Sequence, residues 1–286
     1  MRRLSLLAVA LVLAACAGSQ KAIIQPVSTA NTAGIDYARL VTEAEGHYLA
    51  RADEKELRQS ISMYEIAYAM RPTDAFVLDR LAVAYYQLGY AYTTTDAGKI
   101  ANHERGLQFA LKRLELDPGY KKVVDSGGSM VDAVAKITDP RYVHALQFAA
   151  ANWGWVGEKK GISSMAFDIP KVKALFERAM ALDPAYLCYA PVVMAASYYA
   201  KAGAFGGDMD KAHKYFEEAI QARECYDNKM LYAEFYAIPT DNEELFHKLS
   251  TEVDQAPVDT STIYILENRV AKEKAKKFLA KEAQLF

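Results

Sequence analysis

The sequence predicts an all-α protein, built as an array of helix hairpins with irregular insertions and additional helices at its C-terminal end. Three observations lead to this prediction. Apolar residues recur at helical spacing, one such pattern repeats along the chain, and no segment of strand length alternates strictly between apolar and polar residues. With only 15 glycines and 9 prolines among 286 residues, most of the chain is free to be helical. The 52% of hydrophobic residues exclude a disordered chain, and the net charge of -2 argues against a nucleic-acid partner.

The N-terminal segment, residues 1–15, has the parts of a secretory signal peptide. Two arginines precede an apolar run of about 11 residues, which is too short to span a bilayer. The run ends in Leu-Ala-Ala followed by Cys16, the tetrapeptide at which bacterial lipoprotein signals are cut. We therefore expect Cys16 to become the new N-terminus and to carry lipid, palmitate among its acyl chains. An uncleaved anchor, or an ordinary signal peptide that happens to contain a cysteine, is the alternative.

The expected lipid would hold the protein on a membrane. Several acyl chains on one residue anchor a protein firmly, because each buried methylene contributes about 0.8 kcal/mol. Ala17 follows the cysteine, and the lack of an aspartate there favours the periplasmic side of the outer membrane in a Gram-negative-type bacterium. Residues 16–34 are mostly small and polar, so we expect them to form a flexible tether for a single domain at residues 35–286.

An internal repeat organises that domain. One pattern places a large apolar residue, two small residues, an aromatic residue and a glycine at relative positions 0, 3, 4, 7 and 11, starting at Leu78, Leu146 and Val192. A second pattern, at positions 0, 4, 7 and 12, starts at Ser60, Val172 and Ala212, with a weaker copy from Gly106. Each pattern is one face of a helix, and together they are the A and B helices of tetratricopeptide (TPR) repeats. They predict TPR-like units at about residues 37–72, 75–118, 141–184 and 186–224, with insertions at 90–105 and 121–139.

The chain continues as helix beyond the last repeat. Pro239 and Pro257 divide residues 228–286 into three expected helical stretches, at 228–237, 241–254 and about 260–285.

The order of several short motifs resembles the TRAP-transporter-associated TPR lipoproteins, the TatT component family, over nearly the whole mature chain. The motifs are Ala-Asn-Trp-Gly at 151–154, Arg-Ala-Met-Ala-Leu-Asp-Pro at 178–184, Gly-Gly-Asp at 206–208, Tyr-Ala-Glu-Phe-Tyr at 232–236 and the ending from Asn268 to Phe286. Thr240, Cys188 and Cys225 depart from the usual pattern. The resemblance implies a lipid-anchored periplasmic accessory protein. It would work beside the solute-binding protein of a tripartite ATP-independent periplasmic (TRAP) transporter, which imports small organic acids and similar ligands.

Four residues are candidates for a ligand or partner groove: Asn152, Trp153, Trp155 and Tyr199. Trp153 and Tyr199 occupy the aromatic position of the repeat, which favours packing in the core. Trp155 lies outside that register and is a candidate for the wall of a groove or pore. The concave side of a repeat array is where extended or apolar ligands usually dock.

Gly206, Gly207 and Asp208 precede an expected helix. Glycines permit a tight turn and an aspartate accepts hydrogen bonds from the first helical amides, so we predict a helix cap. Binding of an anion is the alternative, which the negative charge of Asp208 disfavours.

Cys188 and Cys225 stand at the two ends of the last expected hairpin, where an antiparallel helix pair brings its termini together. A disulfide is reasonable in an oxidising compartment, and two free thiols are the alternative.

No catalytic or metal-binding constellation is present in the sequence. The five histidines are scattered, and there is no HExxH, G-x-S-x-G, Walker A or Rossmann pattern. We therefore expect no enzyme, no cofactor and no metal. The predicted function is that of an accessory protein which binds a solute-binding protein and assists uptake of a small organic ligand. A TPR scaffold in outer-membrane or envelope assembly is the alternative, and the sequence leaves monomer and homo-oligomer both open.

Overall fold

The computed structural model describes residues 32, 34–161, 166–257 and 263–286. The predicted signal peptide, residues 1–15, the predicted lipidation site Cys16 and nearly all of the tether at 16–34 lie outside the described residues. Within them every regular element is a helix and none is a strand, so the predicted all-α class is confirmed. None of the described helices is both long enough and apolar enough to cross a membrane.

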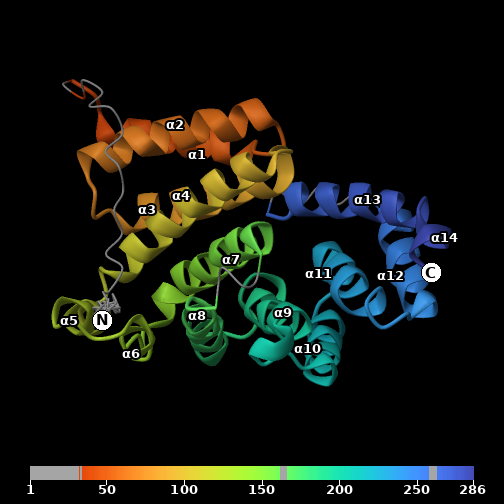
Figure 1. Cartoon of the computed structure of the whole chain (residues 1–286). Helices are drawn as coiled ribbons and strands as arrows, with labels where there is room; N and C mark the ends of the chain where they lie inside the picture. The colour runs from red at the N-terminus through yellow and green to blue at the C-terminus, as the bar shows by residue number, and fades with distance from the viewer. Residues whose placement is uncertain (1–31, 33, 162–165, 258–262) are drawn as a thin grey trace, which may run out of the picture.

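Most of the helices pack as consecutive hairpins (Figure 1). The pairs are α1 (Tyr37–Leu49) with α2 (Glu54–Met70), α3 (Ala75–Gln87) with α4 (Asp96–Leu114), α7 (Val143–Lys160) with α8 (Ile169–Leu182), and α9 (Tyr186–Lys201) with α10 (Met209–Ala222). One pair falls in each of the four repeat units expected from the sequence.

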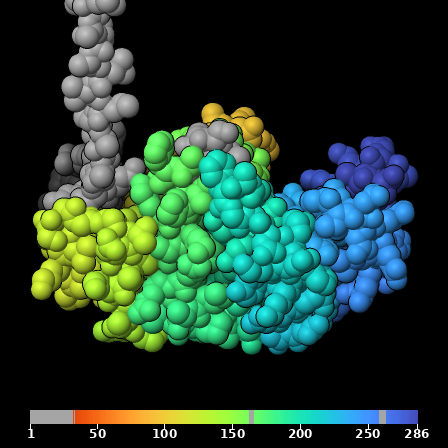
Figure 2. All heavy atoms as spheres, turned by 60° about the horizontal axis from the view of Figure 1, so that its bottom comes forward, coloured from red at the N-terminus to blue at the C-terminus, as the bar shows by residue number. Residues whose placement is uncertain are grey.

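Further helices lie between and after these pairs. Two short helices, α5 (Pro118–Asp125) and α6 (Met130–Val134), occupy the expected insertion before α7. The C-terminal part consists of α11 (Tyr226–Tyr232), α12 (Glu243–Gln255), α13 (Ile265–Leu279) and α14 (Glu282–Leu285). Single π-helical turns, η1 (Leu88–Tyr92) and η5 (Ala233–Ala237), continue α3 and α11. Seen from below, α5–α6, α7–α8, α9–α10 and the C-terminal helices follow one another in chain order (Figure 2).

The repeat positions form the core between neighbouring helices. The first three positions of the first pattern have no exposed surface in any copy, and the pair is two alanines in two copies and Leu81 with Ala82 in the other: Leu78, Leu81, Ala82, Leu146, Ala149, Ala150, Val192, Ala195 and Ala196. Small side chains let the helix backbones approach closely, which is why the pairs recur at this spacing. The aromatic positions of the second pattern, Tyr64, Phe176 and Phe216, are also fully buried.

The structure differs from the sequence prediction in the segment 90–105. This segment was expected to be an insertion, but α4 already begins at Asp96. The Thr95 hydroxyl accepts a hydrogen bond from the Gly98 amide at 3.2 Å, which caps the helix there. His103, inside this first half of α4, is completely buried against the neighbouring repeat.

A second difference lies at the start of α9, where Leu187, Cys188 and Tyr189 have left-handed backbone angles, with φ of 40°, 59° and 60°. These residues carry a Cβ, so each pays roughly 1–2 kcal/mol for this conformation. The regular right-handed part of α9 follows this turn, so the helix does not open at Cys188 as the repeat spacing indicated.

The C-terminal helices close the array back onto its first part. Figure 1 shows α13 reaching from α12 to the ends of the first two hairpins. There Gln87 Nε2 donates to Glu267 Oε1 at 2.7 Å, and Arg269 Nη2 donates to the Tyr92 hydroxyl at 2.7 Å. The π-helical turn η1 is therefore held between its own hairpin and α13.

Candidate functional site

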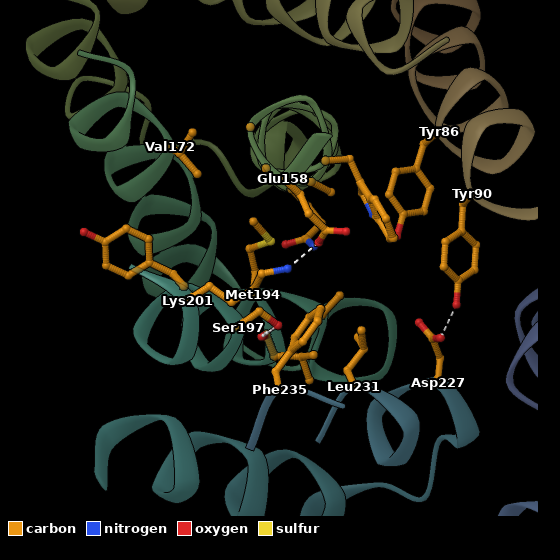
Figure 3. A pocket seen from close by; sticks show the side chains of 18 of the residues that line it. Tyr86, Tyr90, Glu158, Val172, Met194, Ser197, Lys201, Asp227, Leu231 and Phe235 are labelled. Carbon is orange, nitrogen blue, oxygen red and sulfur yellow. Dashed lines mark hydrogen bonds and ion pairs between the residues drawn. The ribbon is translucent and has the colours of Figure 1, made fainter. Parts of the chain in front are cut away.

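A cavity of about 350 Å³ lies where four separate parts of the chain meet. This volume is within the range of small-molecule sites, about 300–1,000 Å³. Figure 3 shows α7 ending over the cavity, α9 below it, the end of α3 and η1 on one side, and α11 and η5 closing it from the C-terminal part. Its lining is largely aromatic and aliphatic: Tyr86, Tyr90, Trp155, Ile169, Val172, Val193, Met194, Tyr198, Leu231 and Phe235.

One wall of the cavity consists of stacked rings. The rings of Tyr86 and Tyr90 stack at 5.8 Å between centroids, and Tyr90 lies 5.8 Å from Trp155. Behind Trp155, His103 stacks on the indole at 5.6 Å with an angle of 5° between the planes. Burial lowers the pKa of His103 to about 4, so this imidazole is neutral at pH 7 and packs as an aromatic ring.

Asp227, at the start of α11, faces this wall. The Tyr90 hydroxyl donates to Asp227 Oδ1 at 2.5 Å, as Figure 3 shows. No cationic side chain of the described chain forms an ion pair with this partly buried carboxyl group. Burial raises the pKa of Asp227, and the bond from Tyr90 and the more distant Lys274 oppose that effect only in part. Asp227 is therefore a carboxyl group whose charge the protein leaves without a close partner.

A second polar group, at the opposite end of the cavity, is by contrast fully paired. Lys201 donates to Glu158, and Lys159 lies 3.4 Å from the same carboxylate. Burial favours a higher pKa for Glu158, but the hydrogen bonds and charges of Lys201 and Lys159 outweigh it and lower the pKa. The Lys201 ammonium also lies 4.1 Å from the centre of the Phe235 ring. Neither charge at this end is available without breaking an existing pair.

Gln147 on α7 supplies a third polar group to the lining. Its side chain is only 6% exposed, and its Oε1 has no hydrogen-bond donor among the described residues. A buried acceptor without a donor costs about 1–3 kcal/mol. The atom has less than 1 Å² of accessible surface, so it lies within the packing around α7 and does not face the open cavity.

The structure places one of the four groove candidates, Trp155, in the cavity wall. Trp153 is 4% exposed and packs in the core of the third hairpin. Tyr199 lies outside the cavity, where its ring stacks on Tyr215 at 5.9 Å.

Asn152 is not part of a groove but fully buried between α3, α4 and α7. Its Oδ1 accepts from His103 Nδ1 at 3.0 Å, and its Nδ2 donates to the carbonyl oxygens of Ala82 and Phe148 at 3.3 and 2.8 Å. Every polar atom of the amide is thus used by the protein itself, so Asn152 has a structural position.

Gly206, Gly207 and Asp208 form the turn into α10. Gly206 has a φ of 98°, and a Cβ on Gly207 would overlap the backbone of Gly203. The Asp208 carboxylate accepts from the Lys211 amide at 3.0 Å, the geometry of a helix cap. The turn is tied to α9, because the Asp208 amide donates to the Tyr199 carbonyl oxygen at 2.8 Å.

Cys188 and Cys225 are joined by a disulfide with a Cα–Cα distance of 6.3 Å. The bond links the left-handed turn at the start of α9 to the residue that precedes α11. Asn228 Nδ2 adds a hydrogen bond to the Cys188 carbonyl oxygen at 2.8 Å. The disulfide therefore fixes α11, which carries Asp227, Asn228 and Leu231 of the cavity lining.

Sequence reasoning missed three residues of this site: Tyr90, Gln147 and Asp227. Tyr90 and Asp227 are separated by 137 positions in the chain, and no local pattern connects them. Gln147 directly follows the repeat position Leu146 and looks like an ordinary helical residue. Among the described residues, no group of three or more His, Cys, Asp and Glu side chains is arranged to hold a metal ion.

The chain matches the family model described as TRAP transporter T-component over residues 43–286. The matched range includes all helices from within α1 to the C-terminus, and with them every residue that lines the cavity. No curated protein matches the chain.

Proposed function

We propose a function from one premise, that this chain belongs to the TRAP transporter T-component family. Membership implies an accessory role in a TRAP transporter and association with that transporter. Our proposal is more specific. The protein is lipid-anchored through Cys16 on the periplasmic side of the outer membrane, binds the transporter's solute-binding protein, and takes up or passes on a small organic ligand through its cavity.

The observation that carries the ligand part of this proposal is the cavity itself. Its walls come from α3 with η1, α7, α9 and α11, and it is lined by apolar and aromatic side chains with a few polar groups. Small-molecule sites have this composition.

The anchoring part rests on the N-terminal sequence alone. An apolar run with a basic start, ending at Cys16, supports cleavage and acylation. Intact mass measurement of the protein purified from membranes tests this directly. A chain that begins at Cys16 and carries acyl mass supports the anchor, and a chain that retains residues 1–15 refutes it.

The partner is tested by affinity purification of a tagged full-length protein from detergent-solubilised cells, with Cys16→Ala as the control for lipid-dependent capture. Recovery of a periplasmic solute-binding protein supports the proposal. Repeated recovery of barrel-assembly or pilus components without a solute-binding protein refutes it and favours the scaffold function.

A further inference from the structure

Asp227 is the acidic side chain of the described cavity lining that has no close cationic partner. Its partly buried carboxyl group accepts one hydrogen bond among the described residues, from the Tyr90 hydroxyl. Among the described residues of the lining, Lys201 is the one cationic side chain, and it is already paired with Glu158 and lies over Phe235. The Asp227 carboxyl group can therefore accept a hydrogen bond from a ligand that donates one.

The charges around the aromatic wall are also unbalanced. Burial raises the pKa of the Tyr90 hydroxyl, and the negative charges of Asp227 and Glu267 add to that effect. The pKa of Tyr86 is raised in the same way, with contributions from Asp227, Glu267 and Glu158. The two tyrosine rings thus lie beside negative charges that Lys274, near Asp227, and Arg51, near Glu267, offset only in part. Lys159 Nζ lies 5.9 Å from the centre of the Trp155 ring in the same wall.

Aromatic rings beside a carboxylate form the usual recognition site for organic cations. The negative faces of Tyr and Trp rings attract an ammonium group within about 6 Å, and the attraction strengthens when the site excludes water. Tyr86, Tyr90 and Trp155 provide such rings next to Asp227, and the remaining lining is apolar enough to hold a hydrocarbon body.

We propose that the cavity binds a small organic ammonium compound with an apolar body, its ammonium group between Asp227 and the rings of Tyr90 and Trp155. This inference rests on the proposed ligand-carrying function and names the ligand class for it. An organic acid is disfavoured, because its carboxylate would have to displace Glu158 from Lys201 and would approach Asp227.

The first test uses the full chain, purified in detergent, and three probes with the same phenyl group. These are phenethylammonium, phenethyl alcohol and phenylpropionate, titrated calorimetrically and followed by tryptophan fluorescence. We expect phenethylammonium to bind at least about tenfold more tightly than the alcohol, and phenylpropionate to bind most weakly. Binding of phenylpropionate that equals or exceeds that of phenethylammonium overturns the inference, as does a failure of all three probes to bind.

The second test uses Asp227→Asn, which keeps an acceptor for the Tyr90 hydroxyl and removes the charge. Glu218→Gln is the matched control, because Glu218 is an exposed residue of α10 and its replacement changes the net charge equally. We expect Asp227→Asn to lose about tenfold in affinity for phenethylammonium and to keep its affinity for the alcohol, with Glu218→Gln unchanged in both. Equal losses for both probes, or no loss for the cation, overturn the inference.

The probe series on the wild-type protein needs no substitution, so the inference remains testable if Asp227→Asn folds poorly. Its outcome is also separate from that of the partner experiment. Failure to recover a solute-binding protein refutes the proposed partner while phenethylammonium still binds. A reversed preference among the probes refutes the ligand class while the partner is still recovered.

Discussion

Replacing Gly106 by alanine should destabilise the protein, although alanine is the better helix former. Gly106 is a buried residue of α4, and a Cβ built on it would lie 2.7 Å from Asn152 Oδ1 and 2.8 Å from Asn152 Nδ2. Asn152 is fully buried and bound on three sides, so it has no free direction in which to move. The added methyl group must therefore push the amide out of its hydrogen bonds.

The magnitude follows from three contributions. Overpacking a core costs about 1–3 kcal/mol, and leaving buried polar groups of Asn152, His103 or Ala82 without partners costs about 1–3 kcal/mol more. The higher helix propensity of alanine returns about 1 kcal/mol. We expect Gly106→Ala to lower the free energy of unfolding by about 2–4 kcal/mol, which lowers Tm by roughly 5–10 °C for a domain of this size.

Gly46→Ala is the matched control, because Gly46 is an exposed position inside α1 where an added Cβ meets nothing within 4 Å. There the propensity gain acts alone and should stabilise the protein by about 0.5–1 kcal/mol. Both variants are compared by thermal and urea unfolding, followed by far-UV circular dichroism.

The steric cause is checked with the double variant Gly106→Ala/Asn152→Ala. When the amide is absent, the methyl group has room, so the cost of Gly106→Ala should fall below about 1 kcal/mol. A Gly106→Ala protein as stable as wild type, or a cost that persists unchanged in the double variant, would refute the reasoning.

Three further outcomes are expected. Serine at Cys188 and Cys225 should lower the free energy of unfolding by about 4 kcal/mol, since the bond closes a loop of 37 residues, and a reductant should lower the Tm of wild type but not of this variant. Burial lowers the pKa of His103 to about 4, so below about pH 6.5 the unfolded chain takes up a proton that the folded chain does not. Between pH 7 and pH 5, the free energy of unfolding of wild type should therefore fall by about 2 kcal/mol more than that of His103→Gln. If urea unfolding shows the same pH dependence of the free energy of unfolding for both proteins, this reasoning is wrong. Phe216→Ala should lower the free energy of unfolding by about 3–5 kcal/mol, because the fully buried ring stacks on Tyr232 with 5.0 Å between ring centres. A decrease below about 1 kcal/mol in urea unfolding would mean that neighbouring side chains fill the space left by the ring.

The repeat could be predicted from the sequence because its information is local. A large residue and a small pair at helical spacing define a buried face without reference to the rest of the chain. The repeat register also predicted different positions for Trp153 and Trp155. The residue in the repeat register packs in the core, and the one outside it lines the cavity.

The left-handed turn at Leu187, Cys188 and Tyr189 could not be predicted in this way. Left-handed angles normally require glycine, and nothing in the side chains of these three residues favours them. The turn is compatible with the fold because Cys188 is bonded to Cys225 and its carbonyl oxygen accepts from Asn228. Both of these contacts come from α11 and the residue before it, far along the chain.

The cavity was missed for a related reason, and the closure by α13 shows how it depends on distant segments. Tyr90 lies in η1, a single π-helical turn between α3 and α4 of the second hairpin. On one side η1 packs on α3 and α4, and on the other it faces α13, where Gln87 just before the turn and Tyr92 at its end bond to Glu267 and Arg269.

The bond between Gln87 and Glu267 is partly buried, and the bond between Arg269 and Tyr92 is exposed. Each involves a charged group, and such hydrogen bonds contribute about 1.5–3 kcal/mol, less where solvent reaches them. What they fix is the orientation of the Tyr90 ring toward Asp227 across the cavity. The hairpins therefore form the array itself. The C-terminal helices close it, with α11 and η5 in the wall of the cavity and α13 against the end of the second hairpin. For this reason the sequence pattern of single repeats predicts the architecture. The cavity forms only where the two ends of the array meet, so the pattern of one repeat does not predict it.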